Sequence, residues 1–260
     1  MDNNYDPKLV EKAKKMTAGP LGKEMTKFPM RFAAPVFFGE SPAVSKKSKI
    51  SNGTASLINF GNGNLAITCY HVLSPFKEQI ESRQDSIFQI GNLKFNPLDQ
   101  IIAESEELDI VTISLTPEQA KEISAGGEIG SLFFMPPFWP PNSVNEKDFV
   151  AFGGFPGRWR QHLSSNEIMF DTYSSGACGV ASVTDEYIVC QFEREYWVVT
   201  LDLHNKEELY DISGLSGGPV FIKRSLHWEF IGIIYQFSQE FELMYIRPSK
   251  FIGEDGVISS

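Results

Sequence analysis

A serine flanked by glycines is the residue of this chain best suited to nucleophilic chemistry. Ser216 stands in the run Gly214-Leu215-Ser216-Gly217-Gly218-Pro219, directly before the apolar run Val220-Phe221-Ile222. Glycines on both sides let the backbone turn sharply, so the hydroxyl can project from a tight loop while neighbouring amides face one point. This geometry suits acyl transfer, although a Gly-rich hairpin loop before a strand has the same composition.

A serine hydroxyl is a weak nucleophile at neutral pH and needs a neighbouring base. The candidate among four histidines is His71, because it directly follows the apolar run at residues 65–70. A structural role also fits an isolated histidine at that place. The other three are expected to be surface or packing residues, because two lie in polar segments and one precedes an aromatic strand: His162, His204 and His227.

A buried carboxylate would complete the site by accepting the second imidazole N–H and fixing the tautomer. Asp109 precedes the strongly apolar run at residues 110–113, where a carboxylate is costly to desolvate without a partner. Taken alone, Asp109 fits equally well as a turn or cap residue at the start of that strand. Asp85 and Asp99 are the alternatives to Asp109 as the carboxylate that contacts the His71 imidazole.

Short β-like runs separated by turn residues must position these side chains, and they predict an all-β protein. A first series is expected at residues 31–38, 54–60, 65–68, 86–90 and 110–115. A second is expected at residues 149–152, 167–173, 179–183, 187–192, 196–201, 219–223 and 228–235. Short strands at this spacing favour two barrels or sandwiches.

The remaining segments set the expected boundaries. Residues 1–27 are predicted to be an appended arm with a short helix at 7–16, followed by one domain over 28–260. Barrel one is expected over about 28–116, a crossover over about 117–148 and barrel two over about 149–252. The crossover should begin with a helix at 117–124 and then pass through a proline-rich stretch that cannot pair as a central strand.

Charge and cysteine usage narrow the function classes. The chain has 33 acidic and 23 basic residues, a net charge of −10, which disfavours a nucleic-acid partner. The three cysteines form no CxxC pair and no even framework, so a reducing, cytoplasmic location is expected. No apolar run near the N-terminus predicts a secretion signal or a membrane span. No metal and no cofactor is expected.

Four motifs in the order histidine, aspartate, serine resemble the signatures of the trypsin-like, chymotrypsin-fold serine peptidases. They are Gly53-Thr54-Ala55-Ser56-Leu57, Ala66-Ile67-Thr68-Cys69-Tyr70-His71-Val72-Leu73, Leu108-Asp109-Ile110-Val111 and the serine motif. Phe152-Gly153-Gly154-Phe155-Pro156-Gly157 is similar to the first strand of the second barrel in bacterial members. The resemblance spans roughly residues 30–252.

The resemblance implies two antiparallel six-stranded β-barrels with the active site at their interface. It also implies a serine endopeptidase in which Ser216 attacks the peptide carbonyl, His71 is the general base and Asp109 orients the imidazole. The backbone amides of Gly214 and Ser216 would form the oxyanion hole. The expected partners are a protein or peptide substrate with a restricted target and, beside it, a regulatory protein.

Two departures from the digestive members bear on regulation and specificity. Leu215 stands where zymogen-type members have an aspartate that pairs with a freshly cut N-terminus, so activation of that type is not expected. Tyr210 occupies the position of the pocket floor by residue count, so a strong preference for Lys or Arg is not expected. Asp211, Glu207 or Glu208 would restore that preference if the loop register shifts.

The implied substrate-pairing strand is residues 233–237, whose edge would take up an extended peptide, with Tyr235 among the substrate-binding residues.

Three alternatives compete with the serine peptidase. The serine motif also satisfies the Gly-x-Ser-x-Gly elbow of α/β-hydrolases, which would make an esterase, but that fold needs a histidine well downstream and only His227 follows. Gly176-Ala177-Cys178-Gly179 resembles the cysteine motif of viral proteases, but Val180 breaks it and a buried thiol is expected. The third alternative is a protease fold without catalytic activity that serves as a peptide-binding or regulatory module.

Overall fold

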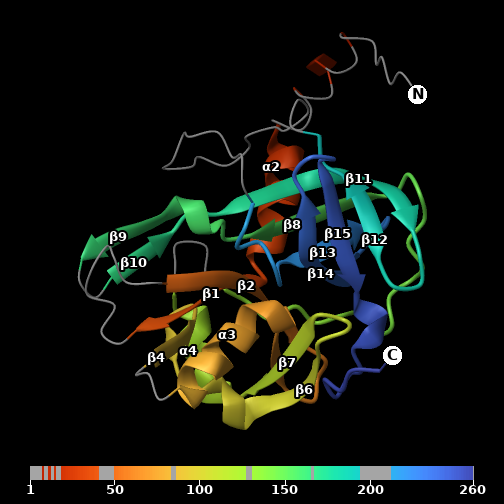
Figure 1. The fold of residues 1–260 in the computed structure, drawn as a ribbon. Coiled ribbons are helices and arrows are strands. Elements are labelled where there is room, and N and C mark those ends of the chain that lie inside the picture. The colour runs from red at the N-terminus through yellow and green to blue at the C-terminus, as the bar shows by residue number, and fades with distance from the viewer. Residues whose placement is uncertain are drawn as a thin grey trace.

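Antiparallel strands are the main secondary structure in the computed structural model (Figure 1). The structure describes residues 8, 11–12, 15, 19–40, 50–82, 86–126, 131–164, 167–193 and 212–259. The helices in these ranges are too short to span a bilayer. The expected strand at residues 196–201 lies outside the described residues.

The first half of the chain forms one curled sheet of seven strands in the order β5-β4-β1-β2-β3-β7-β6, every pair antiparallel. Residues 53–58 of the long central strand β2 are all buried, and each of them is accordingly small or apolar. The bounds are β1 Ala33–Glu40, β2 Ile50–Asn59, β3 Asn64–Thr68, β4 Ser86–Ile90, β5 Leu93–Lys94, β6 Ile101–Ser105 and β7 Ile110–Leu115.

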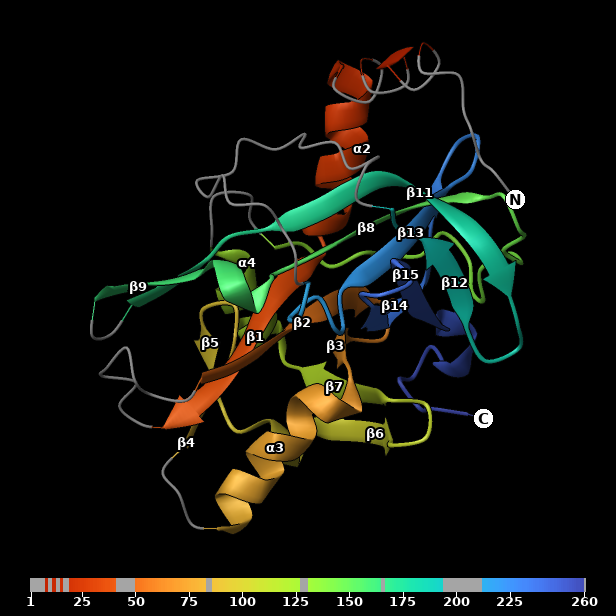
Figure 2. The ribbon, with the colours of Figure 1, turned by 45° about the horizontal axis from the view of Figure 1, so that its top comes forward.

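The second half forms a closed barrel of six strands in the order β11-β12-β15-β14-β13-β8. A separate hairpin of β9 and β10 extends from it (Figure 2). The bounds are β8 Phe149–Gly154, β9 Arg160–Ser164, β10 Glu167–Phe170, β11 Tyr173–Val183, β12 Ile188–Gln191, β13 Pro219–Lys223, β14 Trp228–Ser238 and β15 Leu243–Pro248.

The chain therefore has the all-β, two-barrel chymotrypsin-like fold that the sequence predicts. The first barrel has seven strands in a curled sheet, not six, because the two-residue β5 adds to its edge beyond β4. All strand pairs within the named sheets are antiparallel, which contradicts the parallel sheet that an α/β-hydrolase esterase would need.

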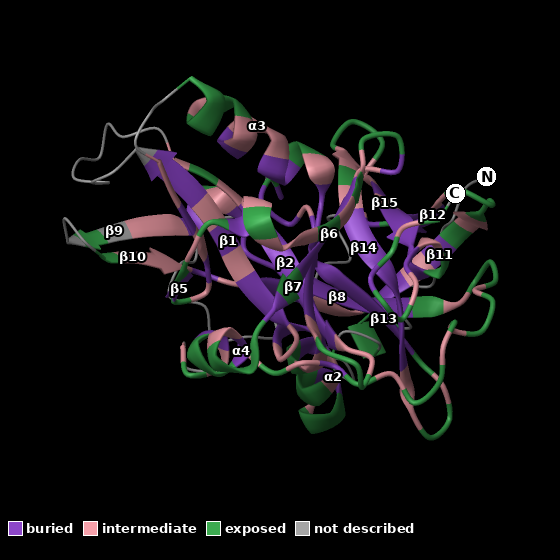
Figure 3. Ribbon diagram, turned by 90° about the horizontal axis from the view of Figure 1, so that it is seen from below, coloured by how far each residue is buried: buried purple, intermediate pink, exposed green. Residues whose placement is uncertain are grey.

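The two barrels share one hydrophobic core where they meet. Phe221, Phe230 and Ile233 of the second barrel belong to the same buried cluster as the apolar residues of the first sheet. Figure 3 shows buried residues in β1, β2, β8 and β13, strands that lie where the two barrels meet. Close packing of fully buried aromatic and β-branched side chains resists relative movement of the two barrels. Residues of one barrel are therefore held at a fixed position relative to residues of the other.

Helix α2, Pro20–Met30, is the main element that the sequence did not indicate. It begins inside the segment expected to be an arm and packs against β8 and β11, where Thr26 and Met30 are buried. Phe28 stacks on Trp228 with ring centroids 4.2 Å apart. The helix was missed because it starts after glycine, contains Pro29 and is stabilised by tertiary packing more than by propensity.

Smaller differences concern strand limits and helices. The expected strand at residues 167–173 is divided between β10 and the start of β11, and β6, β9 and β15 were not predicted. Helix α4, Pro117–Ser124, occurs where expected, with a capping box formed by Thr116 and Gln119. The helix predicted at 7–16 falls mostly outside the described residues.

Candidate active site

His71 is positioned by the junction between β3 and helix α3, Tyr70–Glu81. Cys69 caps the helix in an extended conformation, so the chain turns directly from strand to helix and presents His71 in the first turn. The imidazole side chain is 51% exposed. The turn expected after His71 is therefore the start of a twelve-residue helix, which gives the general-base candidate a rigid mount.

Asp109 reaches His71 because β3 and β7 are neighbours. Thr68 pairs with Val111, so the residues just beyond these strand ends lie opposite one another. Asp109 has a φ of 55°, a left-handed conformation that aspartate tolerates better than most residues. Its Oδ1 accepts a hydrogen bond of 2.9 Å from the His71 backbone N–H, and its Oδ2 lies 2.7 Å from His71 Nδ1.

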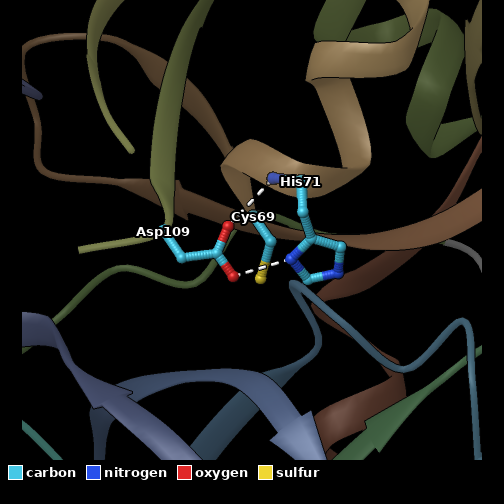
Figure 4. A group of neighbouring side chains, drawn as sticks. All are labelled: Cys69, His71 and Asp109. Carbon is cyan, nitrogen blue, oxygen red and sulfur yellow. Dashed lines mark hydrogen bonds and ion pairs between the residues drawn. The ribbon is translucent and has the colours of Figure 1, made fainter. Parts of the chain in front are cut away.

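This double contact fixes both the position and the orientation of the imidazole (Figure 4). With Nδ1–H donating to Asp109, the neutral ring keeps a lone pair on Nε2, which is the form a general base needs. Asp99 instead accepts from Asn96 within the 3₁₀ helix η1, Pro97–Gln100, and Asp85 lies outside the described residues.

Ser216 stands in the turn before β13, on the second barrel, and is partly exposed. Its carbonyl accepts a hydrogen bond of 2.8 Å from Thr54 N–H on β2. The Ile234 carbonyl on β14 accepts from both Gly217 N–H at 2.7 Å and Cys69 Sγ at 3.3 Å. The Ile234 carbonyl therefore links Gly217, which follows Ser216, to Cys69, which lies two residues before His71. The serine loop thus lies next to the segment that carries His71.

Within the described ranges, no hydrogen bond joins Ser216 Oγ to His71. Contacts between nucleophile and base are often long without substrate and shorten in the complex. The structure therefore brings His71 and Asp109 into direct contact and places the Ser216 loop beside them.

Backbone amides of the serine loop are available to bind an anion. Gly214 and Gly217 have φ values of 104° and 87°, which only glycine adopts readily. Leu215 N–H donates to Ile212 and Gly218 N–H donates to Leu215. In the part of the chain that the structure describes, the N–H groups of Gly214 and Ser216 have no acceptor. Two uncommitted donors flanking one residue are the arrangement an oxyanion hole requires.

Two buried hydroxyls of β2 hold this loop in shape. Thr54 Oγ1 donates to the Gly214 carbonyl at 2.7 Å and accepts from Phe155 N–H at 3.1 Å. Ser56 Oγ donates to the Gly217 carbonyl at 2.8 Å. Both side chains are fully buried. Leu215 is also buried in the core of the second barrel, so packing and hydrogen bonds together order the loop.

For acyl transfer at this site, replacing Thr54 with valine is expected to lower kcat by about 10- to 100-fold with little change in KM, since Gly214, with its carbonyl no longer held, can move its N–H away from an oxyanion. Stability should also fall by about 1–3 kcal/mol, because the buried Gly214 carbonyl and Phe155 N–H lose their partner. Thr112→Val is the matched control. Thr112 Oγ1 donates to the Gly256 carbonyl at 2.6 Å in the first barrel, so this variant should lose stability but keep kcat. Equal kcat losses in both variants would contradict a role for Thr54 at the loop.

Cys69 is the site residue that sequence reasoning missed. Its thiol is fully buried, and burial together with the Asp109 charge raises its pKa well above the usual range, while the Gly217 N–H and Arg247 act in the opposite direction. The thiol is therefore protonated at neutral pH and is a poor nucleophile. Its place in the sequence, two residues before His71, was the available signal.

Tyr235 lies on β14 at a bulge and is half-buried. The guanidinium carbon of Arg247 lies over its ring, 4.4 Å from the ring centroid. Burial raises the pKa of its hydroxyl, Arg247 opposes the shift, and the charge of Asp109 adds to it. Beyond Ile233, β14 pairs only with β15 among the described residues, which leaves its other edge open from Tyr235 onward. Tyr210, Asp211, Glu207 and Glu208 lie outside the described residues.

The remaining cysteine and histidine candidates that the structure describes make structural contacts. Cys178 is buried within β11, where its Sγ donates to the Gln191 carbonyl at 3.1 Å, and Cys190 holds its pKa high, so it is a core thiol as expected. His227 Nε2 lies 2.8 Å from the buried carboxylate of Glu229. The side chain of His162 and all of His204 lie outside the described residues.

Fold and site together define a two-barrel protein of chymotrypsin-like architecture with a His–Asp pair next to a glycine-rich serine loop. No family model and no curated protein matches the chain. Among solved structures it is similar to a chain from a study of aromatic interactions in the coupled folding and binding of the intrinsically disordered Sesbania mosaic virus VPg protein. The identity is 14%, the match covers 85% of this chain and 93% of that chain, and the TM-score is 0.43. A likeness this loose carries no argument about function.

Proposed function

We propose that this chain is a serine endopeptidase that hydrolyses peptide bonds through an acyl-enzyme. The observation that carries the proposal is the double contact of His71 with Asp109, located beside a serine loop whose Gly214 and Ser216 amides are uncommitted. A general base of fixed tautomer, a nucleophile and two oxyanion donors are the parts that acyl transfer needs.

In the first step Ser216 Oγ attacks the substrate carbonyl and its proton passes to His71 Nε2. Asp109 stabilises the imidazolium that forms, and the Gly214 and Ser216 amides bind the developing oxyanion, each worth about 3–4 kcal/mol in comparable enzymes. The imidazolium then protonates the leaving amine. A water molecule, deprotonated by the same nitrogen, releases the acyl group and restores the serine.

The open edge of β14 supports an extended peptide as the substrate. From Tyr235 to Ser238 the strand has β15 on one side only among the described residues, so a peptide can add as a further antiparallel strand next to Ser216. Main-chain hydrogen bonds of this kind are independent of side chains, so selectivity must come from the loops around the site. A restricted protein target is therefore part of the proposal.

The experiment that tests this function is incubation of the purified chain with a mixture of peptides of known sequence, followed by mass spectrometry. New termini that appear with the wild type and are absent with Ser216→Ala support an endopeptidase. Binding of peptides without cleavage would favour the silent peptide-binding module instead.

For specificity we expect no strong preference for Arg or Lys before the cleaved bond, because Tyr210 stands where a pocket carboxylate would be by residue count. The ratio of kcat/KM for matched peptides with Arg and Leu should stay below about 100-fold, whereas a site built around a buried polar partner discriminates by about 10⁴-fold. The net charge of −10 cannot replace such a carboxylate, because salt screens it within about 8–10 Å. A large Arg preference would show that Asp211, Glu207 or Glu208 reaches the pocket.

A further inference from the structure

Three different metal-binding side chains converge at the base of the candidate active site. The ligand atoms of Cys69, His71 and Asp109 all lie within 4.8 Å of one another. They come from the end of β3, the first turn of α3 and the turn before β7. Figure 4 shows the Cys69 sulfur beside the contact between His71 Nδ1 and Asp109 Oδ2.

The Cys69 thiol transfers no proton and attacks no bond in the hydrolysis described above. Its hydrogen bond to the Ile234 carbonyl is a structural contact and does not require a sulfur next to a carboxylate. Thiolate, imidazole and carboxylate are together the ligands that Zn²⁺ and related soft divalent cations prefer. The cluster therefore offers a second chemistry at the same place.

We propose that Cys69, His71 and Asp109 bind a thiophilic divalent cation, with Zn²⁺ as the biological candidate, and that this binding switches the peptidase off. The inhibitory consequence rests on the proposed function, whereas the binding itself does not. In a tetrahedral zinc site, neighbouring ligand atoms are about 3.3–3.7 Å apart. His71 Nδ1 and Asp109 Oδ2, now 2.7 Å apart, must separate by about 0.6 Å, and the sulfur must move toward them.

The site has a path for the ion and a fourth coordination position. The His71 side chain is 51% exposed, so an ion can reach Nδ1 from solvent by rotation of the ring. Three protein ligands leave one position for water, as in zinc sites that exchange their metal. Arg247 lies near Cys69 and disfavours a cation, so we expect reversible binding weaker than that of a four-ligand structural site.

Metal binding removes the general base through the tautomer of His71. The metal takes the lone pair of Nδ1, so the neutral ring must carry its proton on Nε2. Nε2 is then a donor and cannot accept the proton of Ser216 Oγ. The Cys69 thiol binds as thiolate and releases one proton to solvent, while the His71 proton moves from Nδ1 to Nε2. The net exchange is one cation bound and one proton released.

Binding is tested by calorimetric titration of ZnCl₂ into the Ser216→Ala chain, which removes any dependence on activity. We expect one ion per chain and release of about one proton, measured in buffers of different ionisation enthalpy. Adding Cys69→Ala should weaken binding by more than about 100-fold, because even outer-sphere partners contribute 10- to 100-fold. Cys178→Ala is the control and should bind as the parent does. Undiminished binding in the Cys69→Ala chain, or no binding in the parent, would overturn the site.

A second measurement leaves Cys69 unchanged in case its replacement impairs folding. In a Cys178→Ala, Cys190→Ala chain, Cys69 is the sole thiol. One equivalent of Cd²⁺ should then produce a thiolate-to-metal charge-transfer absorption, and its absence would contradict the site.

Inhibition is tested on active chains. Zn²⁺ should inhibit the wild type and the Cys178→Ala control alike, EDTA should reverse it, and Cys69→Ala should raise the inhibitory concentration by more than about 100-fold. Metal binding that depends on Cys69 in a chain without peptidase activity would reject the proposed function and retain the site. Peptidase activity with no inhibition by Zn²⁺ would retain the function and reject the switch.

Discussion

Replacing Ser216 with alanine is expected to reduce kcat by about 10⁴- to 10⁶-fold, the range seen when the nucleophile of a serine peptidase is removed. In the described structure the Ser216 hydroxyl makes no hydrogen bond to the rest of the protein, so its loss should leave the fold intact. We therefore expect a melting temperature within about 2 °C of the wild type, since surface changes cost about 0.5 kcal/mol or less.

The measurement is kcat on a peptide identified in the cleavage screen, alongside thermal unfolding of each variant. Ser175→Ala is the control, because Ser175 is a partly buried serine of β11, and β8 separates this strand from β13, which follows the serine loop. It should retain wild-type kcat. Activity of Ser216→Ala within tenfold of the wild type would exclude Ser216 as the nucleophile.

Replacing Asp109 with asparagine is expected to lower kcat by about 10⁴-fold, and the contacts of Asp109 explain why. Oδ1 is fixed by the His71 backbone N–H, so the amide oxygen should stay there and the amide NH₂ should take the place of Oδ2. That NH₂ donates to Nδ1 and forces the imidazole proton onto Nε2. The ring then has the tautomer that cannot act as a base.

Asparagine is the informative substitution because it also tolerates the left-handed conformation of Asp109, with its φ of 55°. KM should change little, since Asp109 is not expected to contact the substrate. The checks are kcat and KM for Asp109→Asn, with Asp99→Asn as the carboxylate control outside the site. A loss of less than about tenfold in Asp109→Asn would show that the His71–Asp109 contact does not support catalysis.

Most strands could be predicted because alternating and apolar runs report burial directly, and the resemblance to the chymotrypsin-fold peptidases then implied their arrangement as two barrels. The strands that were missed, such as β6 and β15, are partly exposed or mix polar and apolar residues, so their pairing depends on neighbouring strands. Helix α2 was missed because Pro29 and Gly22 oppose helix prediction and tertiary contacts, mainly with β8 and β11, compensate. Local sequence patterns therefore do not predict elements whose stability comes from tertiary packing.

At the site, residue types identified His71 and Asp109 as candidates, but their contact depends on the register of β3 against β7, which local sequence does not encode. The same register brings Cys69 next to Asp109; this residue lies within the histidine motif, but the motif assigns it no role at the site. Thr54 was part of a recognised signature, yet its hydrogen bond to the Gly214 carbonyl, 160 positions away, is visible only in the fold.

The central claim, that Ser216 is a nucleophile activated by His71, is tested most directly by covalent labelling with a fluorophosphonate probe. The intact mass of the wild-type chain should increase by one adduct, and peptide mapping should place that adduct on Ser216. Ser216→Ala and His71→Ala should remain unlabelled, and Cys178→Ala should label as the wild type does. An adduct at another residue, or no adduct on a folded wild-type chain, would contradict the account.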